Sequence, residues 1–247
     1  MKVNEIINSS VDEGWKDWAA TLGVAGALGI GANTGVDNNP QPKQSASGKV
    51  IPATQQPVSQ QPAKPPVAKP AITKIDLDKL SNALPAPGQL LKKHAMQSGL
   101  KGEELIQFLA QAQHETLNFT RTEEIGNKKY FRKYDPKFNP KKAKILGNVK
   151  VGDGERYKGR GFLQITGRWN YRAAGKALGL PLEQKPHLVN SPDVAAKVSI
   201  WYWNTFVKPE VKNFKDVRSV TKEINPSLNG LQDRHAKFNY LMKVVAR

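Results

Sequence analysis

Glu115 is the side chain in this sequence whose type and setting best suit acid catalysis. Apolar residues recur at helical spacing between positions 103 and 116, namely at Leu105, Phe108, Leu109 and Ala112. A helix over this stretch would place Glu115 on the flank of the apolar stripe, where partial desolvation favours the protonated carboxyl that a general acid needs. A lone boundary glutamate is more often half of a salt bridge, so periodicity alone leaves both interpretations open.

A second carboxyl group follows closely in the chain. Glu123 and Glu124 stand eight and nine residues after Glu115, beyond the expected end of the helix. Glycoside hydrolysis uses two carboxyl groups: one protonates the leaving oxygen, and the other acts as nucleophile or activates water. A helix end followed by a loop can bring such a pair across a cleft, but the spacing does not choose between Glu123 and Glu124.

The stretch 157–171 joins glycines to polar and aromatic side chains. If it is extended, Phe162, Gln164 and Thr166 share one face, and the alternate residues Leu163 and Ile165 enter the core. An amide and a hydroxyl on the open face could hold water or a sugar hydroxyl, beside the flat rings of Trp169 and Tyr171. The alternative is a glycine-rich turn with core aromatics. The stretch lacks the Gly-Lys-Ser/Thr ending of a phosphate-binding loop.

The elements that must position these side chains are predicted to be mainly helices. Ser191-Pro192-Asp193 is typical of a helix start, with a capping hydroxyl, a proline and an acid at the positive end. A final helix is indicated by Leu231, Phe238, Leu241 and Val245. No alternation of strands and helices and no internal repeat is evident. About 170 residues suffice for a hydrophobic core without disulfides, and the sequence contains no cysteine.

We expect the catalytic domain to cover residues 75–247, and two segments precede it. For residues 1–36 we expect a polar segment followed by a weakly hydrophobic, Gly/Ala-rich helix. Residues 37–74 form a Pro/Gln-rich linker that should be disordered and extended. For residues 18–36 three interpretations stand: a weak export or signal-anchor segment, a helix that contacts a membrane or virion protein, and a mobile tail.

The charge is concentrated in the expected domain. Of the net +17, residues after 74 supply +15, from 31 Lys and Arg against 16 Asp and Glu. Such a field attracts polyanions, for which nucleic acid and anionic bacterial envelopes are candidates, although it also serves plain solubility. The four histidines lack ligand spacing, so we predict no metal and no cofactor.

The motifs together resemble glycoside hydrolase family 19, which contains class I-type chitinases and phage or bacterial endolysins with lysozyme activity. The resemblance rests on His114-Glu115-Thr116, Phe119, Glu124 and the block from Tyr157 to Tyr171, and continues at Leu146–Asn148, Gly152–Gly154, Ile224-Asn225 and Asn229–Arg234. It implies a lysozyme-like fold with two mostly helical lobes around a central cleft, and an inverting single displacement.

The resemblance also implies roles for individual residues. Glu115 matches the general acid, Glu124 the proposed base and Thr166 the hydroxyl that helps to hold the attacking water. Substrate-binding or bracing positions are His114, Tyr157, Gln164, Trp169, Asn170, Asn225 and Arg234. This chain departs from the endolysin pattern twice. Leu117-Asn118 replaces a Gly-Gly pair after the acid, and Pro226-Ser227 replaces a second one after Asn225.

The function expected on this basis is that of a muramidase that hydrolyses the β-1,4 bonds of peptidoglycan. The strong positive charge and the lack of a cysteine-rich chitin-binding module favour it over a chitinase acting on N-acetylglucosamine polymers. A lytic transglycosylase would lack the second carboxyl. A catalytically weak wall-binding or virion structural protein is a further alternative.

The family implies a phage lysis or virion-associated setting. We expect a monomer that is made in the host cytoplasm or carried in a virion. It would act at the bacterial wall, from the periplasm or from the outside. Its partners would be peptidoglycan and the anionic envelope, with no nucleic acid.

Overall fold

The computed structural model describes residues 75–246, so the expectations for residues 1–74 lie outside the described part of the chain. Within residues 75–246 the regular structure is helical, and β-pairing is limited to isolated bridges between Glu123, Arg160 and Ile165. The prediction of a mainly α domain is confirmed. No helix in this range is long and apolar enough to cross a membrane.

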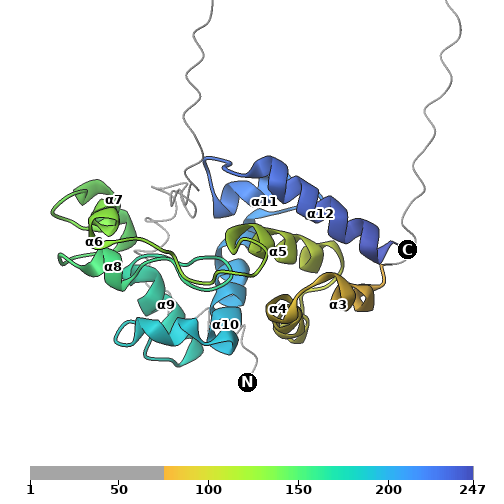
Figure 1. Cartoon of the computed structure of the whole chain (residues 1–247), viewed down its shortest axis with the longest axis horizontal. Helices are drawn as coiled ribbons and strands as arrows, with labels where there is room; N and C mark the ends of the chain where they lie inside the picture. The colour runs from red at the N-terminus through yellow and green to blue at the C-terminus, as the bar shows by residue number, and fades with distance from the viewer. Residues whose placement is uncertain (1–74, 247) are drawn as a thin grey trace, which may run out of the picture. The chain divides into compact units, whose positions relative to one another are not determined.

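The helices follow one another along the chain, and within residues 75–246 the longest stretches without helical residues are 116–127 and 157–167 (Figure 1). In chain order they are α3 (Leu80–Ala83), α4 (Ala86–Gln97), α5 (Gly102–Glu115), α6 (Lys128–Phe131), α7 (Pro140–Leu146), α8 (Asp153–Arg156), α9 (Arg168–Leu178), α10 (Pro192–Tyr202), α11 (Val217–Ile224) and α12 (Leu231–Val245). Short 3-10 turns cover Leu77–Lys79, Arg132–Tyr134, Pro186–Asn190 and Lys208–Glu210, and Trp203–Val207 forms a π-helical turn.

Helix α5 is the central element of the larger lobe. Its residues from Leu105 to Ala112 are all buried, and it lies along α12, with α4 and α11 also in contact. Phe108 meets Trp203 edge to face, with ring centroids 5.2 Å apart. Burial of this whole stretch supplies the apolar area that fixes the orientation of α5, and therefore of Glu115 at its end.

The predicted helices are present, with small local differences. The helix expected over 103–116 is α5, and the final helix is α12. Ser191 is the N-cap of α10 and Pro192 its first residue, but the Ser191 side chain makes no capping hydrogen bond. The fixed φ of the proline therefore starts this helix without help from the serine hydroxyl.

A smaller lobe is formed by α6, α7, α8 and the turns between them, residues 128–156. It has a hydrophobic cluster of its own, made by Phe131, Tyr134 and Leu146, separate from the main core. Figure 1 shows these helices at one end of the domain, away from α12. The stretches 116–127 and 157–167 join the small lobe to the rest, which agrees with the two-lobed architecture that the sequence predicted.

Candidate active site

Glu115 lies at the last position of α5 and forms an ion pair with Arg234 of α12. Its side chain is 10% exposed and that of Arg234 is 1% exposed. The guanidinium of Arg234 also donates to Gln111 Oε1, one helical turn before Glu115, and to the backbone carbonyl of Asn229. The ion pair uses Oε1 of Glu115, so Oε2 is the oxygen available for proton transfer. The apolar flank expected around Glu115 therefore also contains a buried cation.

His114 connects the same two helices on the neighbouring face. Its Nδ1 lies 2.6 Å from Oδ2 of Asp233, and Gly230 sits so close to the ring that a Cβ there would come within 2.1 Å of Cε1. Burial and the nearby Arg234 lower the pKa of His114, and the bond to Asp233 opposes them in part. The His114 ring thus ties the end of α5 to the start of α12.

Glu124 is held by donors from the small lobe and from the stretch after it. Tyr130 and Tyr134 donate their hydroxyls to Oε1 over 2.8 and 2.9 Å, and the backbone N–H of Gly159 donates to Oε2 over 3.0 Å. Lys133 Nζ lies 3.5 Å from Oε1. Burial and the charge of Glu124 raise the pKa of both phenols, so they remain donors to this carboxylate.

Glu123 points to different partners. Its carboxylate accepts from Arg160 Nε at 2.8 Å and lies 3.2 Å from Lys158 Nζ. Although burial acts to raise the pKa of Glu123, these two cations hold it below its ordinary value. Adjacent residues of extended chain face opposite ways, and Glu123 is bridged to Arg160. Glu123 is therefore held in an ion-pair cluster, and Glu124 is the better candidate for the second catalytic carboxyl.

Thr166 and Gln164 converge with Glu124 around Gly159. A Cβ added at Gly159 would lie 2.9 Å from Gln164 Oε1, 3.3 Å from Thr166 Oγ1 and 3.4 Å from Glu124 Cβ. Thr166 donates to the carbonyl of Gln164 over 3.0 Å, and Gln164 Nε2 donates to that of Gly161 over 2.9 Å. A larger residue at position 159 would press on these side chains, so glycine leaves room for Gln164 and Thr166 to approach Glu124.

The extended conformation predicted for 162–166 is wrong. Residues 161–164 form a turn, in which Gly161 and Gln164 have φ of 82° and 51°. Phe162 is fully buried together with Leu163 and Ile165 instead of alternating with them, and it meets Phe119 with ring centroids 6.1 Å apart. The turn forms because all three apolar side chains can reach the core that way, which strand alternation would not allow.

The remaining predicted positions have structural partners. Asn170 Nδ2 donates to the carbonyl of Thr166 over 2.8 Å, and Tyr171 donates to that of Lys158 over 2.7 Å from a fully buried ring. The Oδ1 atoms of Asn170 and Asn225 are buried acceptors without a protein partner among the described residues. Trp169 packs against Phe206 in the main core, with ring centroids 6.1 Å apart. Tyr171 is thus a core residue and not a flat surface for a sugar.

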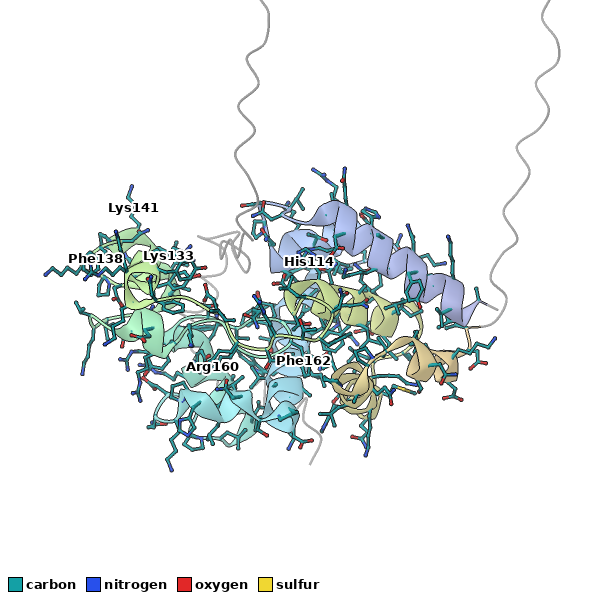
Figure 2. The ribbon with its side chains drawn as sticks, viewed as in Figure 1. His114, Lys133, Phe138, Lys141, Arg160 and Phe162 are labelled. Atoms are coloured by element: carbon teal, nitrogen blue, oxygen red, sulfur yellow. The ribbon has the colours of Figure 1, made fainter. Side chains whose placement is uncertain are left out.

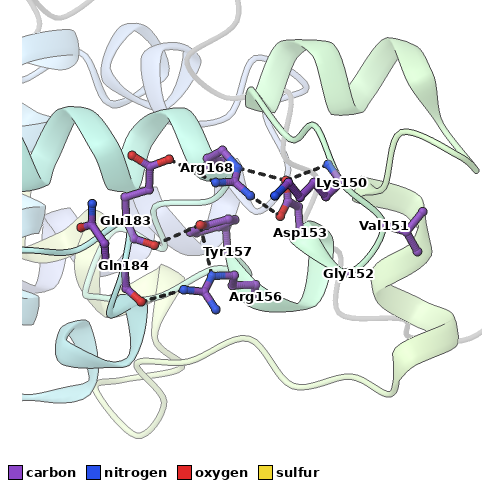
Figure 3. A pocket seen from close by; sticks show the side chains of 9 residues that line it. All are labelled: Lys150, Val151, Gly152, Asp153, Arg156, Tyr157, Arg168, Glu183 and Gln184. Atoms are coloured by element: carbon purple, nitrogen blue, oxygen red, sulfur yellow. Dashed lines mark hydrogen bonds and ion pairs between the residues drawn. The ribbon is translucent and has the colours of Figure 1, made fainter.

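Tyr157 lies beside a separate pocket of about 600 Å³ near α8. Its hydroxyl donates to the carbonyl of Glu183, and Arg168 pairs with both Asp153 and Glu183 (Figure 3). Burial acts to raise the pKa of Asp153, but Arg168 and two backbone N–H groups hold it below its ordinary value. The pocket is therefore bordered by a satisfied ion-pair network, and Glu115 and Glu124 are not among its lining residues.

Sequence reasoning did not single out Gln111, Tyr130 or Tyr134, and it noted Gly159 only as one glycine of the block from Tyr157 to Tyr171. Gln111 could have been found, because it precedes Glu115 by one helical turn and so shares its face. Tyr130 and Tyr134 have the same spacing, but nothing in the sequence indicates that Glu124 is their acceptor. No cluster of His, Cys, Asp or Glu suited to a metal ion occurs within residues 75–246.

The domain is helical and two-lobed, with one partly buried carboxyl at the end of a core helix and one buried carboxyl beside the second lobe. This is the architecture of lysozyme-type glycoside hydrolases. The chain belongs to glycoside hydrolase family 19: residues 93–236 match the profile of the family described as chitinase class I. The protein is therefore a chitinase-like member of the glycoside hydrolases.

Individual relatives support this assignment. A glycosyl hydrolase family 19 domain-containing protein of Haemophilus influenzae is 35% identical over 157 residues, covering 55% of this chain and 76% of the relative. An endochitinase of Arabidopsis thaliana is 33% identical over 159 residues, covering 60% of this chain but only 51% of the plant protein. The crystal structure of a bacterial family 19 chitinase shares the fold, with a TM-score of 0.51 at 22% identity over 69% of this chain and 94% of that one.

Proposed function

We propose that the domain hydrolyses β-1,4 bonds between N-acetylated hexosamine units with inversion, using Glu115 as the acid and Glu124 as the base. The observation that carries this proposal is the separate fixation of the two carboxyl groups. Arg234 positions Glu115 from α12, whereas Tyr130, Tyr134 and Gly159 position Glu124. Two fixed carboxyls with different partners suit two different roles in one displacement.

The proposed reaction is a single displacement. Glu115 gives its proton to the glycosidic oxygen as the bond from that oxygen to the anomeric carbon breaks. Glu124 takes a proton from a water molecule, whose oxygen forms the new bond to the anomeric carbon from the opposite face. In this proposal the oxygen of the buried Thr166 hydroxyl, whose hydrogen is used at the carbonyl of Gln164, accepts a hydrogen bond from that water. Inversion requires roughly 6.5–9.5 Å between the two carboxyl groups, to leave room for the water.

Chitin-type chains of N-acetylglucosamine are the substrate that the relatives support best, since the plant relative is named an endochitinase and the bacterial structure is that of a chitinase. Peptidoglycan is the second candidate, because it contains the same bond type and the net charge of +15 after residue 74 suits an anionic wall. On that alternative the protein would act at the bacterial envelope as an endolysin.

The test compares both substrates and both carboxyls. Purified protein, Glu115→Gln and Glu124→Gln are assayed on chitin oligosaccharides and on isolated peptidoglycan, with the anomer of the first product followed by NMR. We expect chitin oligosaccharides to be cut with release of the α-anomer, and each substitution to lower kcat at least about 1000-fold without loss of the fold.

Other results would change the assignment. Clearing of peptidoglycan with no cleavage of chitin would replace the chitinase by a muramidase. Products with 1,6-anhydro ends would show a lytic transglycosylase, and a β-anomer as the first product would show retention. Normal activity of Glu115→Gln would remove Glu115 from the role of the acid, and inactivity of the unmodified protein on both substrates would favour a binding or structural role.

A further inference from the structure

The charge of the domain is concentrated in one part of the small lobe, which we call the basic segment, residues 128–151. It contains nine Lys and Arg and a single acid, Asp135, and so has a net charge of +8. The other described residues, 75–127 and 152–246, carry 21 basic and 15 acidic side chains, for a net +6. More than half of the net charge of the described domain thus lies on 24 residues.

The acid of the basic segment does not neutralise its surface. Asp135 is buried, and its Oδ1 accepts hydrogen bonds from the backbone N–H groups of Gly152 and Gly154. Lys133 is used at Glu124. Of the other eight cations, Lys142 interacts electrostatically with Glu124. The remaining seven form no ion pair with a carboxylate within residues 75–246: Lys128, Lys129, Arg132, Lys137, Lys141, Lys144 and Lys150.

Apolar side chains are exposed among these cations. Phe138 is 46% exposed, Val149 is 66% exposed and Val151 is 64% exposed. Arg132 lies 4.8 Å from the centroid of the Phe138 ring. Figure 2 shows Phe138 and Lys141 at the outer side of the small lobe, away from His114, and Figure 3 shows Val151 pointing away from the ion-pair network of α8. These side chains therefore serve neither the core nor the candidate active site.

We propose that the basic segment docks the protein on the surface of a bilayer rich in anionic phospholipids. Lysines and arginines near such a surface are attracted to its negative potential, and partly exposed aromatic and aliphatic side chains enter the boundary between headgroups and acyl chains. A soluble polyanion would use the cations equally well, but it would gain nothing from Phe138, Val149 and Val151. The combination of the two kinds of side chain is what favours a lipid surface over nucleic acid or a wall polymer.

Docking at this place would orient the enzyme. Tyr130, Lys133 and Tyr134, which hold Glu124, belong to the same segment, so docking would fix the lobe that carries them relative to the bilayer. The proposal concerns location and does not depend on which sugar polymer is cut.

The test measures partitioning of the full chain onto vesicles of phosphatidylglycerol and phosphatidylcholine in equal amounts, by cosedimentation. The variant K137Q/K141Q/K144Q removes three unpaired lysines of the basic segment. The control K93Q/K197Q/K243Q removes three exposed lysines from α4, α10 and α12 and changes the net charge equally. A third variant, Phe138→Ala, tests the apolar contact, and binding to soluble polyphosphate is measured in parallel.

We expect the first variant to lower the partition coefficient about 100-fold, near fivefold for each lysine, and the control to lower it less than about threefold. Phe138→Ala should weaken vesicle binding about tenfold and leave polyphosphate binding unchanged. Equal effects of the two triple variants would overturn the proposal in favour of general charge attraction. Insensitivity of vesicle binding to Phe138→Ala would overturn it in favour of a polyanion. Cleavage of soluble chitin oligosaccharides, assayed with each variant, reports on the proposed catalysis separately.

Discussion

At the scale of single residues, the two carboxyls differ in the kind of group that fixes them. Glu115 is held by a buried guanidinium, whereas Glu124 accepts from two phenols and a backbone amide. Lys133 lies 3.5 Å from the oxygen of Glu124 that the phenols contact, so this carboxylate is held by a partly exposed ammonium as well as by neutral donors, whereas the partner of Glu115 is a fully buried guanidinium. The phenols are direct targets for mutation, because each can lose its hydroxyl without a change of charge.

Tyr134→Phe should impair catalysis while leaving the fold intact. The variant removes one of the donors that fix buried Glu124, so the carboxylate is less well positioned to take a proton from water. We expect kcat to fall about tenfold and the free energy of unfolding to fall by about 1 kcal/mol. Measurements of kcat on chitin oligosaccharides and of urea unfolding, with exposed Tyr240→Phe as the control, check this. An unchanged kcat would mean that Tyr134 does not position the base.

At the scale of elements, the turn after α5 is the point where this chain departs most clearly from the endolysin pattern. Leu117, Asn118 and Phe119 have φ of 49°, 60° and 65°, in the left-handed region that favours glycine. Thr116 stabilises the turn, since its Oγ1 donates to the carbonyl of Ala112 and accepts from the N–H of Phe119. The backbone expected for a Gly-Gly pair is thus retained with other residues, at the cost of strain.

Leu117→Gly should therefore stabilise the protein. The Leu117 side chain is 51% exposed, so little apolar contact is lost, and glycine removes a left-handed penalty of about 1–2 kcal/mol at an entropic cost of about 0.5–1 kcal/mol. We expect a gain of up to about 1 kcal/mol in thermal unfolding. Met96→Gly, at a partly exposed position within α4, is the control and should destabilise by about 1 kcal/mol or more. A loss of stability in Leu117→Gly would show that the Leu117 side chain has a packing role.

At the scale of the whole molecule, contacts between distant parts of the chain couple stability to pH. His114 and Asp233 are 119 residues apart in sequence and join the two helices that carry Glu115 and Arg234. The pKa of His114 is lower in the folded protein than its unfolded value of about 6.5. At a pH between these two values, the unfolded chain binds more protons than the folded protein does. Stability should consequently fall as the pH falls through this window.

His114→Gln tests this coupling. The unmodified protein should lose stability below pH about 6.5, with a contribution from His114 of at most about 1.4 kcal/mol per pH unit, and the variant should lack that contribution. Urea unfolding between about pH 7 and pH 5 measures it. Although partial burial acts to raise the pKa of Asp233, Lys237 and His114 hold it below its ordinary value. The contribution of Asp233 to stability is therefore lost only at more acidic pH, and it does not mask the pH dependence caused by His114. Parallel pH dependences of the two proteins would contradict the prediction.

The sequence by itself determined the helical class, the position of Glu115 at a helix end and the family. Helical periodicity is a local property, and the block from Tyr157 to Tyr171 is a contiguous motif, so both can be read without a fold. The choice between Glu123 and Glu124 was not decided in this way, because it depends on where Arg160, Tyr130 and Tyr134 lie in space.

Only the tertiary structure decided the partners of the carboxyls and the shape of the turn beside them. Arg234 reaches Glu115 across 119 residues because α12 lies along α5. Phe162 turns into the core because burying it together with its neighbours removes more apolar surface from water than strand alternation would. Glu115 and the pair Glu123 and Glu124 could be named from the sequence, but the groups that fix these carboxyls belong to elements that meet only when the chain is folded.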